Sequence, residues 1–169
     1  MLFRSNGATR NYLVRLNSDG TSDSTFYTNL GTGAFNGPVT SVVVLSDGSI
    51  LVGGNFTTLG VNTRNRMVKL SSTGLEISAF YTSLGTGFNN IVSDIKVQSD
   101  NKILVGGGFT TFNGNTRNKL VRLDSLGIED SGFYVNLGTG FDSDIYTLRV
   151  QSDGKILDRK STRLNSSHT

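Results

Sequence analysis

Several chemistries are excluded by residues that the chain lacks. It has no cysteine, no tryptophan, one proline and a single histidine, His168, among 169 residues. Without cysteine, disulfides, iron–sulfur clusters, thiolate zinc sites and thiol nucleophiles are excluded. Because residues 1–167 hold no histidine either, Ser–His and Cys–His nucleophile pairs and a histidine zinc site are excluded from them. No apolar run approaches the ~18 residues that a membrane-spanning helix needs, so no such helix is expected.

Charge is scarce as well. Only 17% of the residues are charged, with 16 Lys and Arg against 13 Asp and Glu and a net charge of +3, where ~25% charged residues is usual. The cations are spread along the chain, with three to five in each of the first three stretches of fifty residues. Because nucleic-acid interfaces need clustered cations with interleaved aromatic side chains, no nucleic-acid partner is expected.

Glycine is abundant, with 21 residues, and much of it belongs to an internal repeat. Three markers recur with a period of 53 or 54 residues: a Ser-Asp-Gly type turn, Thr-Arg-Asn and Leu-Gly-Thr-Gly. They begin at Ser46, Ser99 and Ser152, at Thr9, Thr63 and Thr116, and at Leu30, Leu84 and Leu137. Since three independent markers keep one period, the chain consists of three copies of one unit.

Each unit has the pattern of short antiparallel strands. The second unit predicts strands over residues 39–45, 49–52 and 66–70, with a weak fourth strand over 75–80. No segment has the 3.6-residue apolar period of an amphipathic helix. Four strands in ~50 residues is the size of a propeller blade. The predicted fold class is all-β, a β-propeller of about three four-stranded blades whose ring is not closed, with a β-solenoid as the alternative.

One stretch carries a specific family likeness. Residues 97–127, VQSDNKILVGGGFTTFNGNTRNKLVRLDSLG, resemble the delta-60 type β-propeller repeat, and the match recurs at three successive positions over residues 1–157. The glycine pair also resembles kelch, whose tryptophan is absent. The resemblance implies a propeller in an extracellular, cell-surface or phage structural protein, and no known catalytic residue. Ile77 departs from the family, which favours aspartate there, as at Asp23 and Asp130.

The repeat breaks off near the C-terminus. After Leu157 the expected Val-Gly-Gly is missing, and residues 158–168, DRKSTRLNSSH, resemble the translation of a common sequencing adapter. We therefore predict two segments: residues 1–157, three repeats truncated mid-repeat at both ends, and residues 158–169, a non-native tail. The remaining blades of the parent chain are then expected as partners.

Candidate site residues are few. Asn17, Asp19 and Asp23 lie in an oxygen-rich loop that is loosely typical of a calcium site, with a plain hairpin turn as the alternative. Asp142 and Asp144 are candidate binding residues, because the third unit departs there from the other two copies. The alternative for both is a polar loop. No catalytic residue and no cofactor other than calcium is predicted.

Features present in every copy are interpreted as scaffold. The arginines of Thr-Arg-Asn are expected to pair with carbonyls or with an aspartate of the next blade. The Phe-Tyr pairs are expected to form core between blades, with a row of sugar-stacking rings as the alternative, and Leu-Gly-Thr-Gly is expected to be a turn or crossover. The arginines are Arg10, Arg64 and Arg117, and the pairs begin at Phe26, Phe80 and Phe133.

These features favour one function over another. The prediction is non-catalytic binding of a protein or polysaccharide surface, adhesion or structural assembly. An accessory or carboxylate-based hydrolase module of a larger enzyme is the alternative, because carboxylate pairs remain possible in residues 1–157, which have neither histidine nor cysteine.

Overall fold

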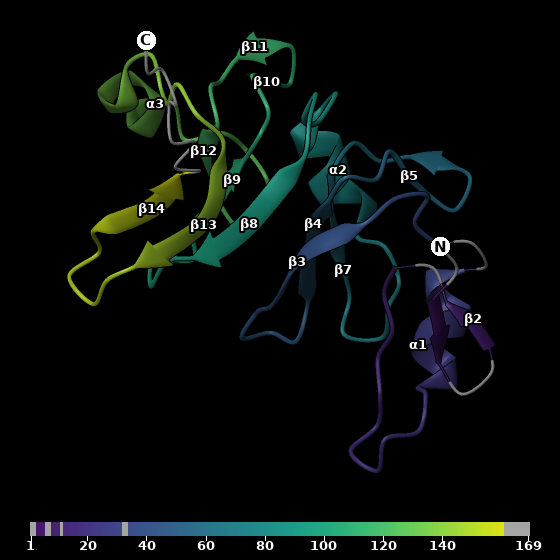
Figure 1. Ribbon diagram of the computed structural model, residues 1–169. Helices are drawn as coiled ribbons and strands as arrows, with labels where there is room; N and C mark the ends of the chain where they lie inside the picture. Colours follow the sequence, from purple (N-terminus) through teal and green to yellow (C-terminus); the bar gives the residue numbers. More distant parts are fainter. Residues whose placement is uncertain (1–2, 6–7, 11, 32–33, 161–169) are drawn as a thin grey trace, which may run out of the picture.

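The computed structural model describes residues 3–5, 8–10, 12–31 and 34–160 (Figure 1). Within these residues, antiparallel strands form three sheets that follow one another along the chain. The sheets are β3 (Val39–Val44), β4 (Ile50–Gly54) and β7 (Met67–Leu70), then β8 (Val92–Val97), β9 (Ile103–Gly107) and β12 (Leu120–Leu123), and lastly β13 (Ile145–Val150) with β14 (Ile156–Lys160).

Three small hairpins and three short helices lie between these sheet strands and before the first sheet. The hairpins are β1 (Phe3–Ser5) with β2 (Ala8–Arg10), β5 (Thr58–Leu59) with β6 (Asn62–Thr63), and β10 (Thr111–Phe112) with β11 (Asn115–Thr116). The helices are α1 (Ser24–Leu30), α2 (Ser78–Leu84) and α3 (Ser131–Leu137). Among the described residues no helix is long and apolar enough to cross a bilayer.

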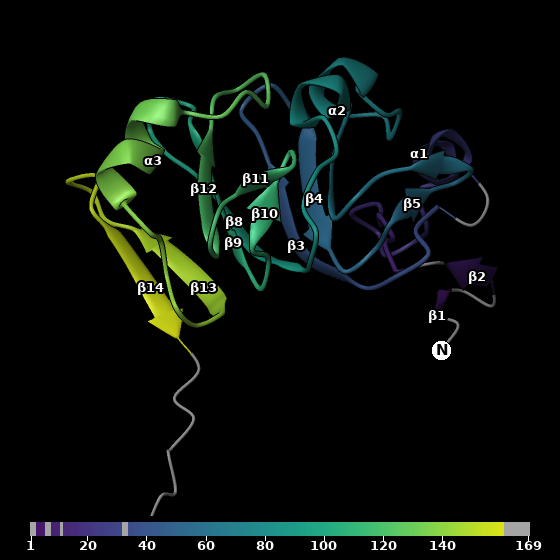
Figure 2. The same cartoon turned by 90° about the horizontal axis from the view of Figure 1, so that it is seen from above.

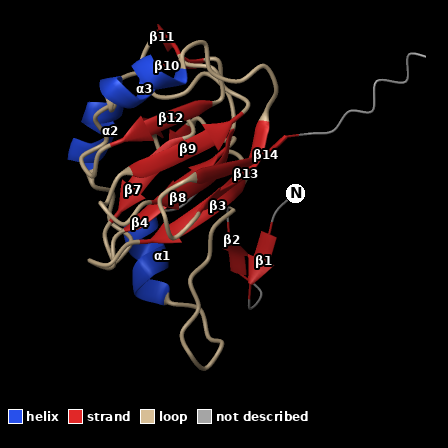
Figure 3. Ribbon diagram, turned by 90° about the vertical axis from the view of Figure 1, so that its left-hand side faces the viewer, coloured by secondary structure: helices blue, strands red, loops and turns tan. Residues whose placement is uncertain are grey.

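The sheets fan out in an arc. Strands β3, β8 and β13 lie side by side along its inner edge, and the helices lie toward the outer edge (Figures 2 and 3). The arc of described residues does not close into a ring (Figure 2). The predicted fold class, an all-β propeller with an open ring, is confirmed.

Glycine in the second strand of a sheet allows the next sheet to approach. A methyl group on Gly53 would lie 2.6 Å from Val92 Cγ1 and 2.9 Å from Ile95 Cδ1, both on the inner strand of the following unit. A methyl group on Gly106 would likewise lie 2.8 Å from Ile145 Cγ2, on β13 of the following sheet. The recurring glycine pair is therefore a packing device, which places the apolar clusters between neighbouring sheets.

The predicted fourth strand over residues 75–80 is wrong. Only one antiparallel bridge, between Leu70 and Glu76, extends the sheet, and the chain then turns into α2. The helix has seven residues, and its two buried side chains, Phe80 and Leu84, are four positions apart. One apolar pair over two turns fits a helix face but is too short to establish a period.

Candidate functional site

A pocket of about 270 Å³ lies where the loops of the second and third units meet. We call it the loop pocket. It is formed by the loop before β7, the crossover between α2 and β8, and the β10–β11 hairpin. Its lining residues are Asn65, Arg66, Thr86, Gly87, Phe88, Asn89, Thr111 and Gly114.

Asparagine side chains hold these loops together. Asn65 Nδ2 donates to Thr86 O at 2.8 Å, and Asn89 Oδ1 accepts from the backbone N–H of Thr110 and Thr111 at 2.9 and 3.0 Å. The same contacts recur one unit away, from Asn118 to Thr139 O at 2.8 Å and from Thr57 N and Thr58 N to Asn36. The loop pocket is thus a preformed feature of the repeat.

The crossover follows its sequence prediction. Residues 84–87 connect α2 to β8, and Gly87 has φ +71°, with its Cα hydrogen facing the carbonyl of Asn65. Leu-Gly-Thr-Gly is therefore a turn and crossover in this unit, while Thr32 and Gly33 of the first copy lie outside the described residues.

Arg66 is the one cation in the lining. Its backbone has φ 72°, a conformation that recurs at Tyr12 and Lys119 at the same position of the other units. Its guanidinium donates from Nη1 to the backbone and side-chain oxygens of Asn55 at 2.8 and 2.7 Å. Burial lowers its pKa, and Nε is buried with no hydrogen-bond partner among the described residues. Non-glycine residues with positive φ store strain and cluster at functional sites.

The loop pocket offers hydrogen bonds and no acid–base pair. Amides, hydroxyls, one guanidinium and backbone groups make up its polar surface, and its lining has no carboxylate or imidazole. Such a set suits ligands that carry hydroxyls or amides, as sugars and polypeptide backbones do.

Asp142 and Asp144 lie at the corresponding place one unit further along. Asp142 occupies the position of Asn36 and Asn89, which hold a loop in their own units. Asp144 Oδ1 lies 2.9 Å from Nζ of Lys119, the residue that corresponds to Arg66. The structure therefore places both candidates at the loop end of the propeller, and their role in binding stays a prediction.

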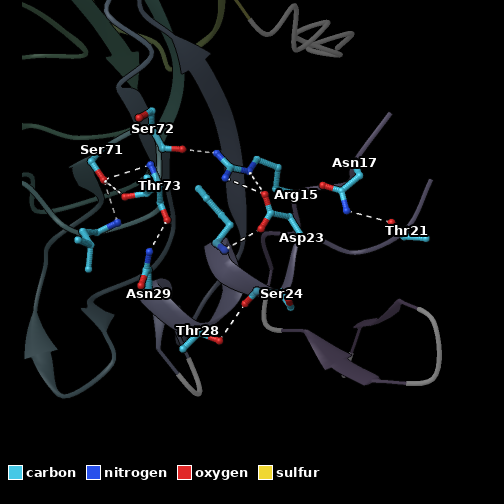
Figure 4. A network of polar contacts seen from close by, with 12 residues as sticks. Arg15, Asn17, Thr21, Asp23, Ser24, Thr28, Asn29, Ser71, Ser72 and Thr73 are labelled. Carbon is cyan, nitrogen blue, oxygen red and sulfur yellow. Dashed lines mark hydrogen bonds and ion pairs between the residues drawn. The ribbon is translucent and has the colours of Figure 1, made fainter. Parts of the chain in front are cut away.

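The calcium candidates are each hydrogen-bonded to neighbouring residues of the chain, and Figure 4 shows Asn17 and Asp23. Asp19 accepts from Thr21 N at 2.9 Å and from Thr21 Oγ1 at 2.6 Å, and these hydrogen bonds, that of the hydroxyl foremost, lower its pKa. Asn17 donates to Thr21 Oγ1, whereas Asp23 turns to Arg15. The described residues contain no group of three or more Asp, Glu, His or Cys side chains that could hold a metal. Calcium binding stays a prediction.

The repeated arginines are structural, and the expected pairing with carbonyls is confirmed for two of them, since Arg64 Nη1 donates to Thr63 O at 2.6 Å and Arg117 Nη1 to Thr116 O at 2.7 Å. Their acidic partner differs from the one expected. Arg64 pairs with Glu76 and stacks 4.2 Å from the ring centroid of Tyr81. Arg117 pairs with Glu129 in the same way. The carboxylate is thus a glutamate of the same unit instead of an aspartate of the next blade, while the side chain of Arg10 lies outside the described residues.

The phenylalanines form core between units. Phe26 and Phe80 are buried against the turns of the following units, where a methyl group on Gly74 or Gly127 would meet them at 2.8 and 3.1 Å. The prediction of core between blades is therefore confirmed for these two residues. Phe133 is partly buried against the last apolar cluster.

Sequence reasoning missed Asp94. It is 8% exposed on β8 and joins the three inner strands, because Oδ1 accepts from Ser41 Oγ at 3.3 Å and Oδ2 from Thr147 Oγ1 at 3.1 Å. Oδ2 also accepts from Leu148 N, and Lys96 Nζ lies 2.6 Å from Oδ1. Burial alone would raise the pKa of Asp94, but the hydrogen bonds outweigh it and lower the pKa.

The signal for Asp94 was present in the repeat. Ser41, Asp94 and Thr147 occupy one position at intervals of 53 residues, and the aspartate departs from two hydroxyl residues. Each follows a β-bulge in its inner strand, and bulges re-aim side chains. An alignment of the three inner strands, searched for positions at which one copy differs from the other two, would have found Asp94.

The comparisons with known proteins agree with this architecture. The family model described as "Domain of unknown function (DUF5122) beta-propeller" matches residues 2–26, 45–74 and 98–133, one segment in each unit. No curated protein matches the chain significantly. Since the three segments make up more than half of the chain and the sheets have the expected arrangement, the chain belongs to the DUF5122 β-propeller family.

Proposed function

We propose that this chain is a non-catalytic binding module that contacts a polysaccharide or protein surface through the loop pocket. The observation that carries the proposal is the lining of that pocket, which holds Asn65, Arg66 and Thr111 in preformed positions and has no acid–base pair. Hydroxyl- and amide-bearing polymers match such a surface, since they both donate and accept hydrogen bonds.

Three carboxylates are engaged in ion pairs or hydrogen bonds within the protein, which supports a binding function over hydrolysis. A carboxylate-based hydrolase needs two acidic groups that are free to face a substrate. Glu76 and Glu129 are each held by an arginine, and both oxygens of Asp94 accept hydrogen bonds within the protein. These contacts favour scaffold roles for the three residues.

A substitution at Arg66 tests the proposal. Arg66→Asn removes the guanidinium and keeps a residue that tolerates positive φ. Wild type and variant are to be compared on immobilised polysaccharides and in protein overlays, and ligands that bind the wild type are then titrated. We expect binding to weaken at least about tenfold, because a hydrogen bond to a charged group contributes ~1.5–3 kcal/mol.

The matched control removes a charge elsewhere. Lys155→Asn lies on an exposed turn, with its side chain 76% exposed, and is expected to leave binding unchanged. Equal losses in both variants would indicate a general charge effect and would reject the loop pocket as the site.

Two further proposals concern setting and sequence. We propose an extracellular, cell-surface or phage structural setting, which rests on the delta-60 resemblance.

We also propose that residues 158–169 are non-native. Arg159 stands in β14 where the other units have Gly53 and Gly106, the glycines that admit the next sheet. Sequencing of intact source DNA tests this, and a read that continues from Leu157 into Asp158 would reject it.

A further inference from the structure

A second pocket, of about 230 Å³, lies on the outer side of the junction between the second and third units. We call it the Lys69 pocket. Its lining comes from β7, from α2 and the residue before it, and from the turn after β12. The lining residues are Lys69, Ile77, Ala79, Phe80, Ser83, Ser125 and Leu126.

The corresponding place at the first junction is filled by the chain's own side chains (Figure 4). Arg15 Nη2 lies 2.8 Å from Asp23 Oδ2, and Arg15 Nη1 donates to the carbonyl of Ser72 in the next unit. Asn29 Nδ2 donates to Thr73 O at 2.9 Å. A cation, a carboxylate and an amide therefore close that junction.

Three substitutions open the second junction. Lys69, Ile77 and Ser83 stand where the first unit has arginine, aspartate and asparagine. Ser83 Oγ turns back to the carbonyl of Ala79 at 3.3 Å, and no hydrogen bond joins Lys69 to the facing turn among the described residues. The smaller side chains of Lys69 and Ser83, with the apolar Ile77, leave a pocket in place of the polar contacts.

Lys69 is a cation without its usual partner. In the first and third units the same position carries an arginine bound to aspartate, Arg122 to Asp130 at 3.0 Å in the third. Within the described chain the ammonium of Lys69 has no ion pair, and it lies 5.8 Å from the ring centroid of Phe80. The carboxylate of Asp47 accepts hydrogen bonds from Ser49, which lower its pKa, and the charge of Lys69 lowers that pKa further without an ion pair.

We propose that the Lys69 pocket binds the carboxylate of a small apolar monocarboxylate. The carboxylate lies next to Lys69 Nζ, as the carboxylates of Asp23 and Asp130 lie next to an arginine in their units. The apolar body packs on Ile77, Phe80 and Leu126, and Leu126 is 64% exposed. The volume is below the ~300–1,000 Å³ of drug-sized sites, so the ligand is small. This proposal is independent of the loop pocket.

Phenylacetate and its uncharged analogue phenylacetamide are suitable probes. Isothermal titration of the full chain with phenylacetate is expected to show saturable binding with a Kd of about 1 mM, given the modest affinity per atom of small ligands. Phenylacetamide, which has the same shape without the charge, is expected to bind at least about tenfold more weakly.

Two variants locate the site. Lys69→Met keeps the apolar stem and is expected to weaken phenylacetate binding at least about tenfold, whereas Lys155→Met, on an exposed turn, is expected to change nothing. Ile77→Asp supplies an internal carboxylate, as in the other two units, and is expected to abolish binding and raise the Tm.

Three results would overturn the proposal that the Lys69 pocket binds a monocarboxylate. Absence of saturable binding to the folded wild-type chain, equal binding of acid and amide, or unchanged binding by folded Ile77→Asp would each overturn the proposal. Should Lys69→Met fail to fold, the comparison of acid with amide on the wild type and the Ile77→Asp result still decide it.

Discussion

At the scale of single residues, the contact between sheets depends on glycine. We predict that Gly53→Ala destabilises the protein by about 1–3 kcal/mol, because its methyl group would lie 2.6 Å from Val92 Cγ1 in a closely packed interface. Urea denaturation gives the free energy of unfolding for wild type and variant. Gly132→Ala in α3 is the control, since its nearest neighbour would be 3.5 Å away. Alanine in a helix should stabilise by ~0.5–1 kcal/mol, and destabilisation by both variants would reject the steric explanation.

Asp94 should make stability depend on pH. Hydrogen bonds lower its pKa in the folded state, so its contribution is complete above the unfolded pKa of ~3.9 and is lost as pH falls through the folded value. We predict that Asp94→Asn costs about 1–3 kcal/mol at neutral pH. The difference from wild type should shrink below about pH 4, which denaturation at a series of pH values measures.

An exposed aspartate serves as the comparison. Asp100→Asn lies on a turn, where asparagine also accepts the hydrogen bond from Lys102 N, and it should alter stability little at any pH. A gap between wild type and Asp94→Asn that stays constant down to acid pH would contradict the assignment to the carboxylate.

Residues that repeat were easier to interpret than residues that differ. The phenylalanines and the crossover glycine were predicted as scaffold because they recur, and their contacts with the next unit agree. The acidic partner expected for Arg64 was wrong, because Glu76 lies twelve residues away and meets it only where the chain turns after β7. Asp94 was missed because its partners come from strands 53 residues away on either side.

At the scale of elements, the aspartate before α1 and before α3 acts twice, as N-cap and as ion-pair partner. Asp130 Oδ1 accepts from Phe133 N at 3.1 Å at the start of α3, while Oδ2 lies 3.0 Å from Arg122 and 3.1 Å from Lys102. We predict that Asp130→Ala loses the cap and the ion pairs and costs about 1–2 kcal/mol. Asp130→Asn keeps a good capping side chain and should cost about half as much.

Chemical denaturation of the two variants separates the two roles. Equal losses would show that the ion pairs, and not the cap, hold the start of α3. The second unit provides an internal reference, because α2 begins after Ile77 without a side-chain cap.

Strands were more predictable than helices for a physical reason. The inner strand, the turn at Asp47 and the second strand are adjacent in sequence and are joined by local hydrogen bonds, so their pattern is visible in one window. The helices have seven residues each, and they are stabilised by packing of Phe26 or Phe80 on another unit. Local sequence therefore contained little of the information that forms them.

At the scale of the whole molecule, the sequence period predicted that the repeat units pack against one another. It did not predict where pockets remain between them. The Lys69 pocket exists because Ile77 and Ser83 differ from their counterparts at a junction that is closed elsewhere. The loop pocket depends on three loops from two units. The Lys69 pocket therefore follows from differences between copies, which a repeat alignment shows only when its departures are mapped onto the junctions.

The open face of the first sheet should drive self-association. Val42 and Val44 on β3 are 47% and 67% exposed, whereas Ile95, which corresponds to Val42, is fully buried against the preceding sheet. Exposed apolar strand faces favour association with other chains. We predict that the chain forms concentration-dependent oligomers or aggregates, to be followed by sedimentation velocity and light scattering.

Substitution of that face identifies the contact. The double variant Val42→Thr with Val44→Thr keeps β-branched side chains and adds polarity, so it should shift the chain toward monomer while preserving the sheet. Val61→Thr is the matched control, because Val61 is 99% exposed in the loop between β5 and β6 and lies on no sheet face. A wild-type chain that stays monomeric at every concentration and melts in one sharp transition would contradict the prediction. Equal dissociation by Val61→Thr would place the contact elsewhere.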